Sequence, residues 1–243
     1  MRSESIEYSV PGDDTVYIGH LAFDDSHDTP RPAVLVCHEG PGLSTHAKNV
    51  ADRLASLGYV AFALDYHGGG VALQRDEMMA RLVPLMNDPD TIRLRARTAL
   101  DLLLAQPVAD PAQVAAIGYC FGGTMALELA RSGVDIAAVV GFHSGLATAR
   151  PEDAANITAK VLVLIGTEDP LIPPQQRSEF EAEMRAGGVD WRMHLYGRAA
   201  HSFTNTQAAD AAMAGIEYDE RADRRSWRAM RDLFDEVFAP IAR

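Results

Sequence analysis

Several short segments of the chain are apolar at nearly every position instead of at alternate positions. Strands that are buried on both faces of a sheet have this pattern, and it is typical of parallel sheets. The segments therefore predict a mostly parallel sheet, with one more strand expected at Trp191–Tyr196. The apolar segments are Ala33–Cys37, Val60–Leu64, Val114–Ile117, Ile136–Val140 and Val161–Ile165.

Segments with helical periodicity lie between these strands. In Thr45–Leu57, Val50 and Leu54 fall on one apolar stripe, and Gly58 follows as a suitable end of the helix. Strands that alternate with helices predict an α/β fold with right-handed crossovers and helices on both faces of the sheet. Further helices are predicted at Asp90–Ala105, Gly123–Arg131 and Pro174–Ala186.

The N-terminal segment predicts an antiparallel hairpin added to this sheet, because Ile6–Val10 and Val16–Ala22 flank the turn-forming stretch Pro11–Asp14. The segment Met78–Met86, interrupted by Pro84, is open to two interpretations, a cap helix or simple core packing. No internal repeat or low-complexity tract divides the 243 residues. Residues 1–243 are therefore expected to form a single α/β domain.

Charge and composition narrow the classes of function. The formal net charge is −12 and the basic residues are scattered, so a phosphate backbone would be repelled. The arginines of Arg221–Trp227 are interleaved with acids, which is typical of a solvated face. The sequence has neither the apolar stretch of a signal peptide nor a run of about 18 apolar residues. We expect a cytoplasmic protein with no nucleic acid or membrane partner.

One of the two cysteines lies in a motif that indicates catalysis. Cys120 is at the centre of Gly118–Gly123, GYCFGG, between an apolar strand and a helix. This is the layout of a nucleophile elbow, G-x-Nuc-x-G, in which a sharp strand-to-helix turn projects the reactive side chain. A buried structural cysteine in a Gly-rich turn is the alternative. Cys37 is expected to pack in the core beside Cys120, and an oxidative disulfide between them is the weaker hypothesis.

A thiol nucleophile needs a base, and the base needs an orienting carboxylate. In α/β hydrolases both partners follow the nucleophile in the chain, each in a loop after a strand. Asp169, in the loop after Val161–Ile165, is the predicted acid, and Glu168 is the second choice. His201, just beyond the strand Trp191–Tyr196, is the predicted base.

Two loops contain candidate oxyanion donors. One is the N–H of Phe121 at the start of the helix after the elbow, and the other is the N–H of Gly40 or its neighbour, after the first parallel strand. His67–Gly70 spells the HGGG of lipases, but it follows the next strand and is interpreted as a coincidental match, with a flexible loop near the site as the role left open. The motif HEGPG at His38–Gly42 lacks the second histidine of an H-E-x-x-H zinc site. No metal and no cofactor are predicted.

These motifs together resemble the dienelactone hydrolase (carboxymethylenebutenolidase) family of the α/β-hydrolase superfamily, over nearly the whole chain. They are H-E-x-x-G after an early strand, G-x-C-x-G-G at the elbow, G-x-x-D-P and H-S-F. The resemblance implies an α/β-hydrolase fold with Cys120 as nucleophile, Asp169 as orienter and His201 as base. It also implies that Glu39 is a fourth functional residue, which keeps the resting thiol neutral by like-charge repulsion.

The sequence departs from the family pattern where the substrate would bind. Dienelactone hydrolases hold the carboxylate of the substrate with arginines, one of them four residues after the catalytic histidine, where this chain has Asn205. A neutral amide cannot replace a charged, bidentate guanidinium. Arg75 or Arg81 is the candidate for the other arginine. We therefore expect a smaller or uncharged ester as substrate, with Tyr66, His143 and Phe203 as further pocket residues.

The leading hypothesis is a cofactor-independent hydrolase that cleaves small esters or lactones through a thioester on Cys120. A catalytically inert α/β-hydrolase-fold binding protein is one alternative, and an acyltransferase with the same triad is another. The expected partner is the small-molecule substrate, and the expected assembly is a monomer or a homodimer.

Overall fold

The computed structural model describes residues 1–26, 28–211 and 213–239, and its strands form a single sheet. The strand order is β1-β2-β4-β3-β5-β6-β7-β8. β1 is antiparallel to β2, β2 is antiparallel to β4, and all other neighbours are parallel. The predicted N-terminal hairpin and mostly parallel sheet are confirmed. The strands are β1 Arg2–Ser9, β2 Val16–Phe23, β3 Arg31–Cys37, β4 Val60–Ala63, β5 Ala109–Tyr119, β6 Ala138–Phe142, β7 Lys160–Gly166 and β8 Trp191–Tyr196.

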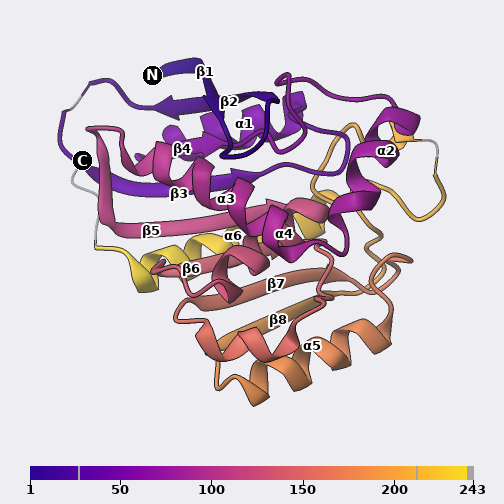
Figure 1. Ribbon diagram of the computed structural model, residues 1–243. Coiled ribbons are helices and arrows are strands. Elements are labelled where there is room, and N and C mark those ends of the chain that lie inside the picture. Colours follow the sequence, from indigo (N-terminus) through magenta and orange to yellow (C-terminus); the bar gives the residue numbers. More distant parts are fainter. Residues whose placement is uncertain (27, 212, 240–243) are drawn as a thin grey trace.

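Helices cover both faces of the sheet, as Figure 1 shows. α3, α4 and α5 lie on one face, whereas α1 and α6 lie on the other. This is the three-layer arrangement that strand–helix alternation predicts. The helices are α1 Thr45–Ala55, α2 Arg75–Leu85, α3 Pro89–Leu104, α4 Phe121–Arg131, α5 Pro174–Ala186 and α6 Glu220–Val237, with short 3-10 turns at Pro151–Asn156 and Ala208–Ala211.

The central strands explain why their sequences are continuously apolar. Every residue of β3 is buried, and its side chains alternate between two separate cores. Leu35 packs in the core beneath α3 and α4, whereas Val34 and Val36 pack in the core beneath α1 and α6. Because both faces are dry, no position in such a strand favours a polar residue.

The predicted strand at Ile136–Val140 is shifted in the structure to β6, Ala138–Phe142. Pairing with β5 sets this boundary, since Ala138 is the first residue in register, opposite Ala115. The strand therefore continues through Gly141, a residue that apolar periodicity does not detect. The shift places the end of β6 directly beside the end of β5, where Tyr119 pairs with Phe142.

The segment with two interpretations forms a helix, α2, that lies over the ends of the strands. Leu85 is its one buried residue, and Pro84 lies in its last turn. A methyl group placed on Gly40 would lie 3.4 Å from Met78 Sδ and 3.6 Å from Leu82 Cδ2, so α2 covers the loop after β3. The cap-helix interpretation describes this segment, and its exposed side chains exclude simple core packing.

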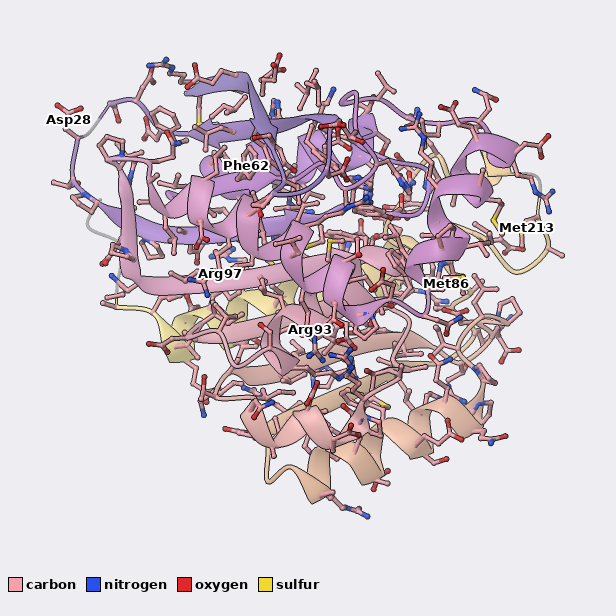
Figure 2. All side chains as sticks on the ribbon, viewed as in Figure 1. Asp28, Phe62, Met86, Arg93, Arg97 and Met213 are labelled. Atoms are coloured by element: carbon pink, nitrogen blue, oxygen red, sulfur yellow. The ribbon has the colours of Figure 1, made fainter. Side chains whose placement is uncertain are left out.

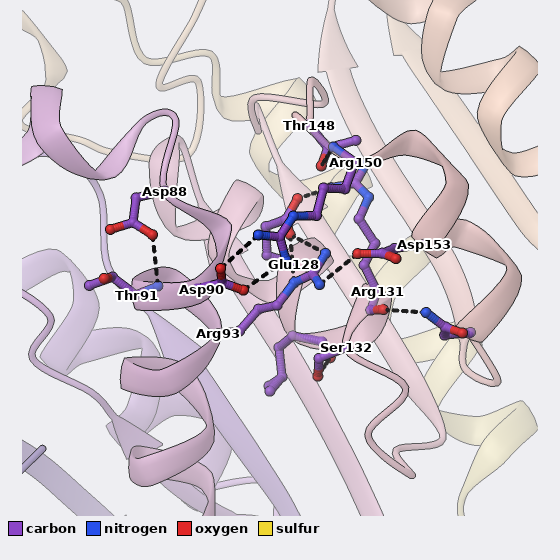
Figure 3. Close-up of polar contacts among 12 residues, drawn as sticks. Asp88, Asp90, Thr91, Arg93, Glu128, Arg131, Ser132, Thr148, Arg150 and Asp153 are labelled. Carbon is purple, nitrogen blue, oxygen red and sulfur yellow. Dashed lines mark hydrogen bonds and ion pairs between the residues drawn. The ribbon is translucent and has the colours of Figure 1, made fainter. Parts of the chain in front are cut away.

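A buried ion network joins the helices of one face (Figure 3). Arg131 of α4 has no exposed surface and forms ion pairs with Glu128 and with Glu183 of α5. Arg93 of α3 binds Glu128 at 2.8 Å and Asp153 at 2.6 Å. The network therefore fixes α3, α4 and α5 relative to one another.

None of the helices in the described part of the chain combines the length and apolarity needed to cross a bilayer.

Candidate active site

The motif around Cys120 forms a sharp turn between β5 and α4. Cys120 itself has φ 55° and ψ −120°, a conformation that residues with a Cβ rarely adopt. A methyl group on Gly122 would collide with the carbonyl oxygens of Cys37 and His38, and one on Gly118 would collide with the Gly122 carbonyl. Both glycines are therefore needed so that α4 can begin directly against β3 and β5. The turn has the geometry of a nucleophile elbow.

His201 and Asp169 form the pair that the sequence predicts. His201 Nδ1 lies 2.8 Å from Asp169 Oδ2, and both side chains are buried. The carboxylate can only accept, so Nδ1 carries a proton and Nε2 is left to take up another. Glu168 is exposed and contacts Thr167, which makes Asp169 the residue that orients the histidine.

Cys120 also affects the pKa of the His201 imidazole. Burial by itself would lower the pKa of His201, but the Cys120 thiolate and the hydrogen bond to Asp169 outweigh burial and raise this pKa to about 10. Nε2 is buried and has no hydrogen-bond partner in the described part of the chain. The ring is thus fixed by Asp169 at one nitrogen, and its other nitrogen is left without a partner within the described residues.

Two backbone N–H groups are available near the elbow. Phe121 begins α4, so its N–H lies at the positive end of the helix dipole. Gly40 follows β3 in the loop beneath α2. Within the described residues, neither N–H group donates a hydrogen bond to another protein group. Both are therefore free to stabilise an oxyanion.

Glu39 is held as an anion by three neighbouring side chains. His46 Nδ1 lies 3.4 Å from Oε2, Asn205 Nδ2 donates to Oε2 at 2.8 Å, and Ser202 Oγ donates to Oε1 at 3.2 Å. Burial favours the neutral acid, but His46 and Asn205 outweigh burial and lower the pKa of Glu39 to about 2. Asn205 therefore binds a carboxylate after all, but the carboxylate is one of the protein's own.

Three of the predicted pocket residues are buried beneath the site. Tyr66, His143 and Phe203 have no exposed surface, so they cannot line an open pocket in this conformation. His143 bonds Thr204 at 2.8 Å and packs edge-on against His201, with ring centroids 5.1 Å apart. Burial and the neighbouring His201 lower the pKa of His143 well below its usual value, so its ring is neutral.

Of the two candidate arginines, Arg81 already has partners within the protein. Arg81 donates to the His67 carbonyl at 2.7 Å and pairs with Glu77 at 2.6 Å. Arg75 is exposed at the start of α2. Apolar side chains are instead exposed at this end of the molecule, where Figure 2 shows Met86 and Met213. Arg81 is thus not an unpaired cation, and exposed apolar side chains lie at this end of the molecule.

Cys37 is fully buried at the end of β3, opposite Gly118 of β5, and both cysteines are free thiols. Burial raises the pKa of the Cys37 thiol, which keeps it protonated and unreactive. Among the described residues, no group of three or more His, Cys, Asp or Glu side chains is placed to hold a metal ion.

Comparisons with known proteins agree with this geometry. A model described as the dienelactone hydrolase family matches residues 19–238. The chain belongs to the dienelactone hydrolase family. It is therefore a hydrolase of the class that acts on esters and lactones. The predicted α/β-hydrolase fold is confirmed by solved structures that match almost the whole chain.

Two solved structures and one relative are similar to this member of the dienelactone hydrolase family over almost the whole chain. The protein m3DLH is 45% identical with a TM-score of 0.93, and the match covers 98% of this chain and 99% of that one. P91, described as a dienelactone hydrolase-like promiscuous phosphotriesterase from metagenomic libraries, is 40% identical with the same TM-score and coverage. A Yersinia pestis protein named as a carboxymethylenebutenolidase is 26% identical over 95% of this chain and 87% of its own.

Sequence reasoning missed several polar residues of this dienelactone hydrolase family site. His46 and Ser202 were not candidates, although both contact Glu39. His67, whose lipase-like motif is interpreted as coincidental and whose loop is left open as a neighbour of the site, bonds the Gly40 carbonyl at 2.8 Å. Ser202 directly follows His201, the predicted base, and could have been found on that ground. His46 lies in the first turn of α1, and no motif connects it with Glu39.

Proposed function

We propose that the protein hydrolyses small, uncharged carboxylic esters or lactones with Cys120 as the nucleophile. The observation that carries this proposal is the buried His201–Asp169 pair, in which Asp169 holds Nδ1 at 2.8 Å and Nε2 has no partner within the described residues, together with the strained turn at Cys120. A cysteine used only for packing would need neither the strained backbone at Cys120 nor a buried imidazole beside it.

The roles follow from this geometry. The Cys120 thiolate attacks the carbonyl carbon, and the N–H groups of Phe121 and Gly40 stabilise the oxyanion. When the ester C–O bond breaks, His201 gives the Nε2 proton to the leaving oxygen, and a thioester remains on Cys120. Water then attacks the thioester while His201 takes its proton. Collapse of the second oxyanion releases the acid and restores the thiolate.

Glu39 and Asn205 favour an uncharged substrate. The Glu39 carboxylate is anionic and lies in the loop that also contains Gly40. An anionic substrate would meet like charge there without an arginine to offset it. In its direct contacts Glu39 bonds His46, Ser202 and Asn205, so its effect on the charge of Cys120 acts through space and stays a prediction.

The two alternatives fit the site less well. An inert binding protein would not need the His201–Asp169 pair, which costs free energy to bury. An acyltransferase would use the same triad with an acceptor other than water, and product analysis separates this activity from hydrolysis. Hydrolysis needs no second substrate site, and we therefore propose it for this chain.

The test compares wild type with Cys120→Ala on p-nitrophenyl acetate. We expect the substitution to lower kcat by at least about 1,000-fold, because it removes the nucleophile while Phe121 and Gly40 remain. Cys37→Ala is the matched control, and we expect it to keep kcat within about threefold. Mass spectrometry after rapid acid quench should find an acyl group on Cys120 of wild type. Wild-type turnover in Cys120→Ala would refute the proposal.

A second candidate activity is the cleavage of neutral phosphate triesters. The similarity to P91, whose description gives it phosphotriesterase activity, favours it, and such substrates carry no charge that Glu39 would repel. The same variants can be assayed with diethyl p-nitrophenyl phosphate. Release of p-nitrophenolate by wild type at no more than the Cys120→Ala rate would exclude this activity.

A further inference from the structure

The carbonyl group of Glu39 is held by an unusual number of donors. His38 Nδ1 donates to it at 2.7 Å, the Tyr66 hydroxyl at 3.0 Å and the Gly42 N–H at 3.1 Å. Most buried carbonyl groups need one partner, and a third adds little to stability. Two of these donors are buried aromatic side chains brought from different segments, so the arrangement fixes the direction of this carbonyl.

The tautomer of His38 follows from its neighbours. Because a carbonyl oxygen only accepts, Nδ1 must carry the proton, and Nε2 then accepts from the Tyr66 N–H at 3.3 Å. The His38 ring also stacks on the Tyr66 ring, with centroids 3.8 Å apart. Arg95 donates to the Tyr66 carbonyl at 2.8 Å and holds the tyrosine backbone. His38 and Tyr66 thus form one rigid unit beneath the loop.

The direction of the Glu39 carbonyl determines the direction of the next N–H. The Glu39 carbonyl and the Gly40 N–H belong to one planar peptide unit, and in a trans peptide they point in opposite directions. The donors that hold the Glu39 carbonyl therefore also fix the Gly40 N–H, which points away from them on the opposite side of the peptide unit. His67 fixes the following unit in the same way, through its 2.8 Å bond to the Gly40 carbonyl.

We propose that Tyr66 and His38 are positioning residues that aim the Gly40 N–H into the oxyanion hole by holding the opposite end of its peptide unit. This inference rests on the proposed function, since it gives Gly40 the role of second oxyanion donor. It also gives His67 a purpose, because a second fixed carbonyl prevents the Gly40 peptide from rotating. The sequence resemblance assigns no such role to any of the three side chains.

Tyr66→Phe tests the proposal because it removes one hydroxyl and keeps the ring. We expect kcat for p-nitrophenyl acetate to fall about 5- to 50-fold with KM nearly unchanged, since a misaligned donor is lost only in the transition state. Alkylation of Cys120 by iodoacetamide forms no oxyanion, so its rate should stay within twofold of wild type. A parallel fall in both rates, or an unchanged kcat, would overturn the inference.

Tyr59→Phe is the matched control. Its ring packs against Phe234 and Phe238 and its hydroxyl does not contact Glu39, His38 or Tyr66, so kcat should not change. The NMR amide signal of Gly40 gives a readout that needs no substrate. We expect it to move in Tyr66→Phe and not in Tyr59→Phe. A stationary signal in Tyr66→Phe refutes the positioning role even if no ester is hydrolysed, whereas a moving signal without ester turnover refutes the proposed function alone.

Discussion

At the scale of single residues, the substitution that distinguishes this site from the family pattern is Asn205. The family pattern has an arginine at this position. The amide of Asn205 donates a hydrogen bond to Glu39 at 2.8 Å. His46 approaches the same oxygen from α1, so the carboxylate keeps its charge although it is buried. Asn205 and His46 are thus already paired with a carboxylate of the protein itself, and they do not need a substrate carboxylate as their partner.

Asn205→Arg should restore activity toward anionic substrates. A guanidinium at this position can pair with Glu39 and still present donors to a substrate carboxylate, so we expect about a tenfold gain in kcat/KM for a carboxylate-bearing lactone and little change for a neutral ester. Steady-state kinetics on both substrates measure this. Gln207→Arg adds the same charge at a nearby exposed position, and an equal gain there would show that general electrostatic attraction is the cause.

At the scale of elements, the parallel strands bring the proposed catalytic residues to one edge of the sheet. Cys120, Asp169 and His201 follow β5, β7 and β8, and Gly40 follows β3. Each strand contributes through the first few residues beyond its end. The pairing of Cys37 with Gly118 sets the height of β3 against β5, and with it the distance between the Gly40 loop and the elbow.

Gly122→Ala should disrupt this junction. The new methyl group would meet the Cys37 and His38 carbonyl oxygens, and backbone cannot move aside as a side chain can. We expect the free energy of unfolding to fall by about 1–3 kcal/mol and ester turnover to be lost. Urea unfolding measures the first. Gly197→Ala, where a methyl group meets nothing within 4 Å, should change stability by less than about 0.5 kcal/mol.

The sequence predicts what local pattern and chain order determine. Apolar runs located the buried strands, and the order of nucleophile, acid and histidine located Asp169 and His201, which the structure brings into contact. Contacts between segments that are distant in the chain could not be predicted from the sequence. His46 meets Glu39, and Tyr66 meets its carbonyl, only because β4 and α1 pack beside β3, and no spacing in the chain encodes those distances.

At the scale of the whole molecule, the two faces of the sheet are stabilised differently. Apolar contacts hold α1 and α6, whereas α3, α4 and α5 also share the buried ions around Arg131. Arg131 in addition donates to the Leu146 carbonyl at 3.1 Å, which ties the network to the loop after β6. The side of the molecule that holds α4, and therefore the elbow, is stabilised by ion pairs that are buried or mostly buried.

Arg131→Ala should lower the free energy of unfolding by about 3–5 kcal/mol, because Glu128 and Glu183 would remain buried without their shared cation. Thermal and urea unfolding measure the loss. The control is Arg97→Ala, which breaks an exposed pair with Asp101 and should change stability by less than about 1 kcal/mol. Equal losses in the two variants would mean that the buried network contributes no more than a surface pair.

The backbone of Cys120 has one further consequence. Its positive φ lies in a region that glycine enters without steric penalty and that other residues occupy at a cost. Selection for thermal stability alone would therefore favour glycine at this position. Under the proposed role of Cys120, such a change would keep the fold and remove the activity, so stability and turnover would place opposite demands on this one residue.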